Sequence, residues 1–242
     1  MGNLSVSCVL LLENHVHIWK GRLNALKEIP KARSMLSERE CIQADRFLFD
    51  RHRNRFILAH ALLRQVLSFY IGLPPHNINF DIGPYGKPAL ALSQNKDLIQ
   101  FNLSHSEDLA LIALRKRSPV GIDLEYWRTR NWMGIAQHAF SKLEYAALEK
   151  VETEKQKESF FHIWVQKEAF IKALGLGFHY PLENFSVTAL PPARLLNASG
   201  EVPEQWMLLS FDPDKEATAA IATRTPCTTT TYYDFEWSET RS

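Results

Sequence analysis

The sequence SERE at residues 37–40 returns as SKLE at residues 141–144, 104 positions further along the chain. Both segments have the Ser-x-x-Glu pattern of a capping box, in which the serine and glutamate side chains accept backbone N–H groups at the start of a helix. Each segment therefore predicts a helix start. We expect the first helix to run through Phe49, and a second helix over Arg55–Tyr70 to end at Gly72.

Further pairs recur in the same order at nearly the same spacing of 104 to 109 residues. These pairs are Phe56 and Phe161, Gly72 and Gly177, Asn79-Phe80 and Asn184-Phe185, and Ile112-Ala113 and Ile221-Ala222. The series predicts a duplicated unit with about 118 residues in its first copy. The alternative is that any two αβ units share caps and terminal glycines. We expect an α+β fold of two similar halves, 1–118 and 119–242, related by a pseudo-two-fold with the active site in the cleft between them.

The composition is that of an ordinary globular chain, with 242 residues, 45% of them hydrophobic, and a net charge of +1. The balanced charge provides no global attraction to nucleic acid or to a membrane surface. Three cysteines without Cys-x-x-Cys spacing argue against a disulfide framework and against a cysteine zinc site. The apolar run near the start is too short for a signal peptide or a membrane span. We therefore expect a cytoplasmic protein.

Strands are expected at 5–19, 78–81, 98–103, 109–114 and 228–233, and the most informative strand is Val120–Glu125. Period two places Ile122 and Leu124 on one face of this strand and Asp123 with Glu125 on the other. Two carboxylates on one face repel each other unless a cation lies between them, and Mg²⁺ prefers such oxygen ligands. The alternative is an edge strand whose acidic face contacts solvent.

A predicted helix carries Trp164, Glu168 and Lys172 at intervals of four residues, so the three side chains share one stripe. Two interpretations are open. Glu168 and Lys172 can form an ordinary ion pair on the surface of the helix. Alternatively, Glu168 is a third carboxylate for a metal ion and Lys172 contacts a phosphate.

Basic and hydroxyl groups occur at three further turns. Ser104 and His105 lie where the strand 98–103 ends, and such a strand end suits an anion. Lys87 follows a tight Gly-Lys-Pro turn, which is not a Walker loop. Arg55 belongs to a basic run at 50–55, for which a solvated surface is the alternative. His15 and His17 share a strand face, but no third metal ligand lies nearby in the sequence.

Six motifs in order resemble the Sfp-type 4′-phosphopantetheinyl transferases. They are Arg46-Phe47 with Arg55, Gly86-Lys87-Pro88, Phe101–Ser106, Gly121–Glu125, Phe140–Glu144 and Trp164–Lys172. The resemblance covers residues 40–190 and implies two similar α+β halves with the active site between them. It also implies the family's reaction, in which the phosphopantetheine arm of coenzyme A is transferred to a serine of an apo carrier protein and adenosine 3′,5′-bisphosphate is released.

The resemblance also implies roles for individual residues. Asp123, Glu125 and Glu168 would bind Mg²⁺, which neutralises charge on the leaving bisphosphate. Glu168 would be the catalytic base, unless a bound water serves instead, and Lys172 would hold the pyrophosphate. The remaining coenzyme A contacts implied by the motifs are Arg55, Lys87, Pro88, Ser104, His105 and Asp123, with Arg55, Lys87 and His105 at the adenosine 3′-phosphate.

The sequence departs from the family pattern at Glu40 and Gln43, where some members carry lysines. Lys31 or Arg33 are the substitutes that the sequence offers for coenzyme A contacts. The segment 128–138 with its neighbouring aromatics is a candidate docking surface for a carrier helix, or else a cover for the core. We expect a monomer. Two other functions stay open, a non-catalytic module that binds coenzyme A and a Mg²⁺-dependent phosphohydrolase.

Overall fold

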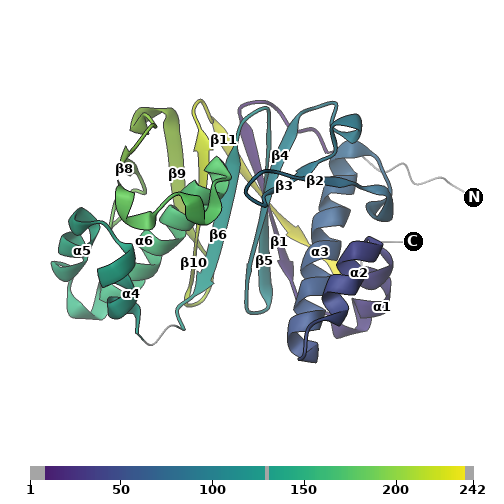
Figure 1. Ribbon diagram of the computed structural model, residues 1–242, viewed down its shortest axis with the longest axis horizontal. Coiled ribbons are helices and arrows are strands. Elements are labelled where there is room, and N and C mark those ends of the chain that lie inside the picture. The colour runs from purple at the N-terminus through teal and green to yellow at the C-terminus, as the bar shows by residue number, and fades with distance from the viewer. Residues whose placement is uncertain (1–8, 129–130, 238–242) are drawn as a thin grey trace, which may run out of the picture.

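The computed structural model describes residues 9–128 and 131–237, and within them one order of elements occurs twice (Figure 1). The first series is β1 (His15–Arg22), α1 (Ile29–Ser34), α2 (Glu38–Asp45), α3 (Asp50–Ile71), β2 (Phe80–Ile82), β3 (Pro88–Leu90), β4 (Ile99–Ser106) and β5 (Leu109–Lys116). The second is β6 (Val120–Tyr126), α4 (Trp132–Ala139), α5 (Lys142–Glu149), α6 (Thr153–Leu174), β7 (Phe185–Val187), β8 (Leu195–Ala198), β9 (Trp206–Asp214) and β10 (Ala217–Arg224), followed by β11 (Thr229–Phe235). The predicted α+β fold of two similar halves is confirmed.

Two sheets form the centre of the molecule. The first has the order β11-β1-β5-β4 and the second β6-β10-β9, with β5 and β10 antiparallel to both of their neighbours. The sheets lie side by side in Figure 1, with α3 on the outer side of the first sheet and α6 on the outer side of the second. A buried cluster that draws on both sheets includes Ile18, Leu111, Ile122 and Ile221. Burial of this shared apolar surface holds the halves together.

The long helices α3 and α6 show how well the repeat was predicted. Each has 22 residues, and α3 ends as expected at Gly72, which adopts a φ of 68° that favours glycine. In the second half the helix-ending glycine is Gly175, with a φ of 72°, so the predicted pairing of Gly72 with Gly177 is wrong by two residues. The first predicted helix ends at Asp45, and α3 begins at Asp50, five residues earlier than expected.

Both predicted capping boxes are present, and each glutamate has a second role. Glu40 accepts from the guanidinium of Arg64 at 2.7 Å, and Glu144 accepts from the ammonium of Lys167 at 2.7 Å. These four groups are buried, and each ion pair anchors a capped short helix to the long helix that follows it. Glu40 is therefore part of the framework of the first half. Desolvation by burial alone would raise its pKa, but hydrogen bonds from His60 and Ser37 outweigh this effect and lower the pKa to about 2.

Candidate active site

Helix α6 approaches strand β6 unusually closely, and a glycine makes this possible. A Cβ atom on Gly121 would lie 2.1 Å from the carbonyl oxygen of Ala169 and 2.4 Å from the backbone nitrogen of Ala173. Any side chain at Gly121 would therefore push the helix away from the strand. The close contact holds the end of α6 that carries Glu168 and Lys172 against the face of β6 that carries Asp123.

Lys172 and Asp123 form an ion pair at the centre of this contact. The Lys172 Nζ lies 2.5 Å from Asp123 Oδ1 and 3.1 Å from Ser104 Oγ, and the Ser104 hydroxyl donates to the same Asp123 oxygen at 3.0 Å. The other oxygen, Asp123 Oδ2, is buried and has no hydrogen-bond partner among the described residues. An ionised oxygen without a partner is costly, so this atom is available to a ligand that supplies positive charge or a donor.

Glu125 and Glu168 lie close enough to Asp123 to respond to its charge. Burial is the main cause that raises the pKa of Glu125 to about 7, and the charges of Asp123 and Glu168 add to it. Burial also raises the pKa of Glu168, again with a contribution from Asp123, while Lys172 lowers it. The structure therefore brings the three predicted carboxylates and the predicted lysine into one electrostatic cluster, the acidic cluster below.

Strand β4 is tied to β6 by side chains at alternate positions, a feature that the sequence analysis missed. The side-chain oxygen of Asn102 accepts from the N–H of Ile122 at 2.8 Å, Ser104 donates to Asp123, and Ser106 donates to Glu125 at 3.1 Å. Asn102 and Ser106 therefore belong to the side chains that hold β4 against the strand of the acidic cluster. The signal for them was the same period of two that grouped Asp123 with Glu125.

The acidic cluster fits a hard divalent cation in its chemistry. Carboxylate oxygens are the ligands that Mg²⁺ prefers, and Asp123 Oδ2 is a buried carboxylate oxygen that lacks a partner. Within 9–128 and 131–237, however, no three His, Cys, Asp or Glu side chains are already gathered in the geometry of a metal site. As described, Lys172 supplies the positive charge beside Asp123.

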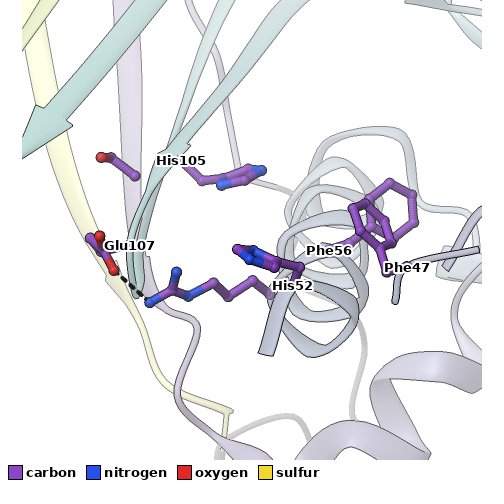
Figure 2. Close-up of a pocket in the computed structure, with 7 residues that line it drawn as sticks. Phe47, His52, Phe56, His105 and Glu107 are labelled. Atoms are coloured by element: carbon purple, nitrogen blue, oxygen red, sulfur yellow. Dashed lines mark hydrogen bonds and ion pairs between the residues drawn. The ribbon is translucent and has the colours of Figure 1, made fainter. Parts of the chain in front are cut away.

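A pocket of about 290 Å³ lies between the end of β4 and the start of α3 (Figure 2). His52 and Phe56 reach into it from α3, and His105 and Glu107 from the end of β4 and the turn that follows. Desolvation and the nearby positive groups His60, Lys172 and Arg55 lower the pKa of His105. The pocket, called the cationic pocket below, thus lies within electrostatic reach of the acidic cluster.

Arg55 lines the cationic pocket as the motif implies, but it already has two acidic partners. Its Nη2 donates to Glu107 Oε2 at 2.7 Å and its Nε donates to Asp108 Oδ1 at 2.8 Å. These bonds hold the guanidinium in place, and its side chain is only 12% exposed. The alternative of a purely solvated arginine does not describe Arg55.

Lys87 does not line the cationic pocket. Its ammonium donates to the carbonyl oxygens of Val120 at 2.9 Å and Lys172 at 2.7 Å, and more weakly to that of Ala173 at 3.4 Å. Desolvation lowers the pKa of Lys87 to about 8. The sequence motif could not indicate this arrangement, because the partners are backbone atoms of the other half. Pro88 begins β3, where it pairs with Ile82.

The two substitutes proposed for the missing lysines lie near α2. Arg33 forms a bidentate ion pair with Asp45, with both distances below 3.0 Å. Lys31 lies in α1. Neither residue lines the cationic pocket. Gln43 lines a second pocket, together with Arg39 and Arg46.

The aromatic residues next to the predicted docking segment contact the second core. Trp127 donates to Thr218 at 2.9 Å, and Trp132 and Met133 pack against the buried cluster around Phe160. These contacts agree with the core-covering interpretation. Residues 129 and 130 of the segment lie outside the described residues.

The chain matches transferases of one class over most of its length. A family model for the 4′-phosphopantetheinyl transferase superfamily matches residues 119–222, and one for the N-terminal domain of 4′-phosphopantetheinyl transferase matches residues 21–117. The transferase HetI of Nostoc sp. (strain PCC 7120 / SAG 25.82 / UTEX 2576) is 36% identical over 216 residues, which cover 88% of this chain and 89% of the relative. The transferase psf-1 of Bacillus pumilus is 34% identical over 84% of this chain and 85% of its own length. Sfp of Bacillus subtilis (strain 168) is 33% identical over 70% of this chain and 74% of its own.

The chain therefore belongs to the 4′-phosphopantetheinyl transferase superfamily. The resemblance inferred from six motifs is confirmed, and with it the expectation of an enzyme whose family transfers phosphopantetheine from coenzyme A to carrier proteins. None of the described helices combines the length and the hydropathy that a bilayer crossing requires.

Proposed function

We propose that this chain transfers the phosphopantetheine arm of coenzyme A to a serine of an apo carrier protein, with the reacting phosphorus at the acidic cluster. The observation that supports the proposal is the arrangement around β4. Ser104 is bonded to Asp123 and Lys172, while the adjacent His105 lines the cationic pocket. Ser106 lines the same pocket and donates to Glu125, so one ligand at the end of β4 can contact both places.

Coenzyme A has two phosphate groups to match these places, a 3′-phosphate on the ribose and a pyrophosphate. Arg55 and His105 in the cationic pocket are the contacts for the 3′-phosphate. Lys172 is the contact for the pyrophosphate, as a point charge that now pairs with Asp123. The Ser104 hydroxyl accepts a hydrogen bond from the Lys172 ammonium and so orients that lysine.

In the transfer the serine oxygen of the carrier forms a bond to the phosphorus next to pantetheine, and the bond from that phosphorus to the bridging oxygen breaks. Adenosine 3′,5′-bisphosphate leaves with the bridging oxygen. The serine proton passes to Glu168 or to a water beside it, and burial favours this because it raises the pKa of Glu168. Lys172 stabilises the charge that develops on the leaving group.

Asp123, Glu125 and Glu168 are the residues that would hold Mg²⁺. When bound, Mg²⁺ would neutralise charge on the pyrophosphate and offset the repulsion among the three carboxylates. Asp123 Oδ2 is the oxygen open to such an ion, because Lys172 contacts Oδ1.

Lys87 takes a different place in the proposal from the one its motif implies. Its hydrogen bonds to Val120 and to the last turn of α6 join the β2–β3 hairpin of the first half to the segment that carries Lys172. We assign Lys87 a positioning role, and we keep Pro88 as a contact through its turn. A monomeric state and a cytoplasmic location complete the proposal.

Incubation with coenzyme A and Mg²⁺, with and without an apo carrier protein, tests the function by mass spectrometry. Transfer adds the phosphopantetheine arm to the carrier and requires the carrier serine. Coenzyme A cleavage without a carrier would instead identify a phosphohydrolase. Binding of coenzyme A without any product would identify a non-catalytic binding module.

A further inference from the structure

Glu107 is a carboxylate in the wall of a pocket whose other ionisable side chains are His52, Arg55 and His105. Its two oxygens contact two arginines. Oε2 accepts from Arg55 at 2.7 Å, and Oε1 lies 3.8 Å from the Nε of Arg128, at the edge of the second half. A phosphate that enters the pocket therefore meets an arginine that is already neutralised, and a negative charge beside it.

Glu107 has an unfavourable backbone conformation. It lies in the two-residue turn between β4 and β5 with a φ of 49°, a region in which glycine is favoured over residues with a side chain. The turn closes equally well without a carboxylate. Arg55 also does not need Glu107 to stay in place, because Asp108 holds its Nε at 2.8 Å from outside the pocket lining.

We propose that Glu107 determines the affinity of the cationic pocket for the 3′-phosphate by competing with it for Arg55. The inference rests on the proposed function and deepens it. A bound 3′-phosphate must take Arg55 Nη2 from Glu107 or share it, and like-charge repulsion then weakens binding. The same repulsion acts on the product adenosine 3′,5′-bisphosphate, so Glu107 favours product release at the expense of tight nucleotide binding.

Isothermal titration calorimetry of the full-length protein tests this with two probes, adenosine 3′,5′-bisphosphate and adenosine 5′-monophosphate. Only the first carries the 3′-phosphate. Glu107→Gln keeps the size of the side chain and removes its charge. It should tighten bisphosphate binding by up to roughly fivefold, since an ion pair near the surface contributes at most about that factor, and it should leave binding of the monophosphate unchanged.

Two further variants make the result specific. Glu216→Gln removes one negative charge from an exposed turn of the second half, and it should change neither affinity. Glu107→Gly removes the carboxylate and relieves the backbone, so it should also tighten bisphosphate binding while raising the melting temperature.

The outcomes distinguish the competition by Glu107 from the assignment of the 3′-phosphate to the cationic pocket. If both Glu107 variants bind the bisphosphate as weakly as the unmodified protein or more weakly, Glu107 orders Arg55 for the ligand and the competition is wrong. Equal tightening by Glu216→Gln would also overturn it, in favour of a general charge effect. If the unmodified protein shows no preference for the bisphosphate over the monophosphate, the assignment of the 3′-phosphate to this pocket fails first.

Discussion

Asp123 has two carboxylate oxygens in opposite situations. Oδ1 accepts from both Lys172 and Ser104, and Oδ2 is buried without a partner in the described part of the chain. A group that served only to hold the strand in place would have both oxygens satisfied. This imbalance supports the proposed role of Asp123 in binding a ligand.

Asp123→Ala should therefore lower the rate of carrier modification by about 10²–10³, because it removes a group that helps to stabilise the developing charge. The fold should persist, since the substitution also removes a buried carboxylate and leaves Lys172 at the edge of the site. The rate is measured by mass spectrometry of the carrier and the fold by circular dichroism. A rate within a factor of two of the unmodified enzyme would take Asp123 out of the site.

Glu125 makes stability depend on pH. Its pKa is raised in the folded state to about 7, from an ordinary value of 4.5, so the folded protein retains a proton that the unfolded chain releases. This contribution lowers stability as the pH rises from about 4.5 to 7, and the loss persists above pH 7. In buffer without divalent ions, Glu125→Gln should raise the melting temperature by a few degrees at pH 8 and have little effect at pH 4. A shift of equal size at both pH values would contradict the assignment.

At the scale of elements, α6 and the strands around it form the site by close contact. Gly121 allows α6 to touch β6, and Lys87 reaches across from the first half to the carbonyl oxygens of the last turn of α6. The helix that carries Glu168 and Lys172 is thus fixed by one small residue in its own half and by one long side chain from the other half.

Lys87→Met should remove this fixation while keeping the aliphatic stem of the side chain. We expect kcat to fall by about tenfold to a hundredfold, as for a displaced catalytic group. The preference for coenzyme A over dephospho-coenzyme A should not change. The ratio of kcat/KM for the two substrates measures this preference. Were that ratio to collapse with kcat preserved, Lys87 would be a direct contact of the 3′-phosphate.

The site shows what a sequence can and cannot predict. The pairing of Asp123 with Glu125 and the stripe of Glu168 and Lys172 follow from the periods of a strand and a helix, and such local periods are readable in one sequence. The hydrogen bonds of Lys87 cannot be predicted from such periods, because the partners of its ammonium are carbonyl groups 33 and 85 residues away along the chain. Motifs placed Lys87 near the site but could not tell which way its side chain points.

The fold shows the same limit on a larger scale. Capping boxes and terminal glycines predicted the repeat, but the choice between Gly175 and Gly177 depends on where the last turn of α6 ends. Strand β11 was predicted as a strand, but its position in the first sheet was not predicted. It pairs in parallel with β1, over 200 residues earlier, so the end of the second half completes the sheet of the first.

At the scale of the whole molecule, the pairing of β11 with β1 makes the stability of the fold depend strongly on the C-terminal segment. Phe235 and Trp237 are each only 6% exposed and belong to the first core. A chain truncated after residue 228 loses both aromatic groups, each worth roughly 3–5 kcal/mol, together with the ladder of β11. Its melting temperature should fall sharply, and it should lie well below that of a chain truncated after residue 237, which keeps β11 and both aromatic groups. Equal melting temperatures for the two truncated chains would contradict this account.

The duplication also has a consequence for how many ligands one chain holds. Helices α3 and α6 are equal in length, and the residues of α3 at the positions of Glu168 and Lys172 are Gln65 and Phe69. Helix α3 therefore lacks both the carboxylate and the ammonium that α6 carries. Although the architecture is doubled, the binding stoichiometry should be a single coenzyme A per chain, read directly as the molar ratio at the midpoint of a calorimetric titration. A ratio of two would mean that the first half has kept a working site built from other residues.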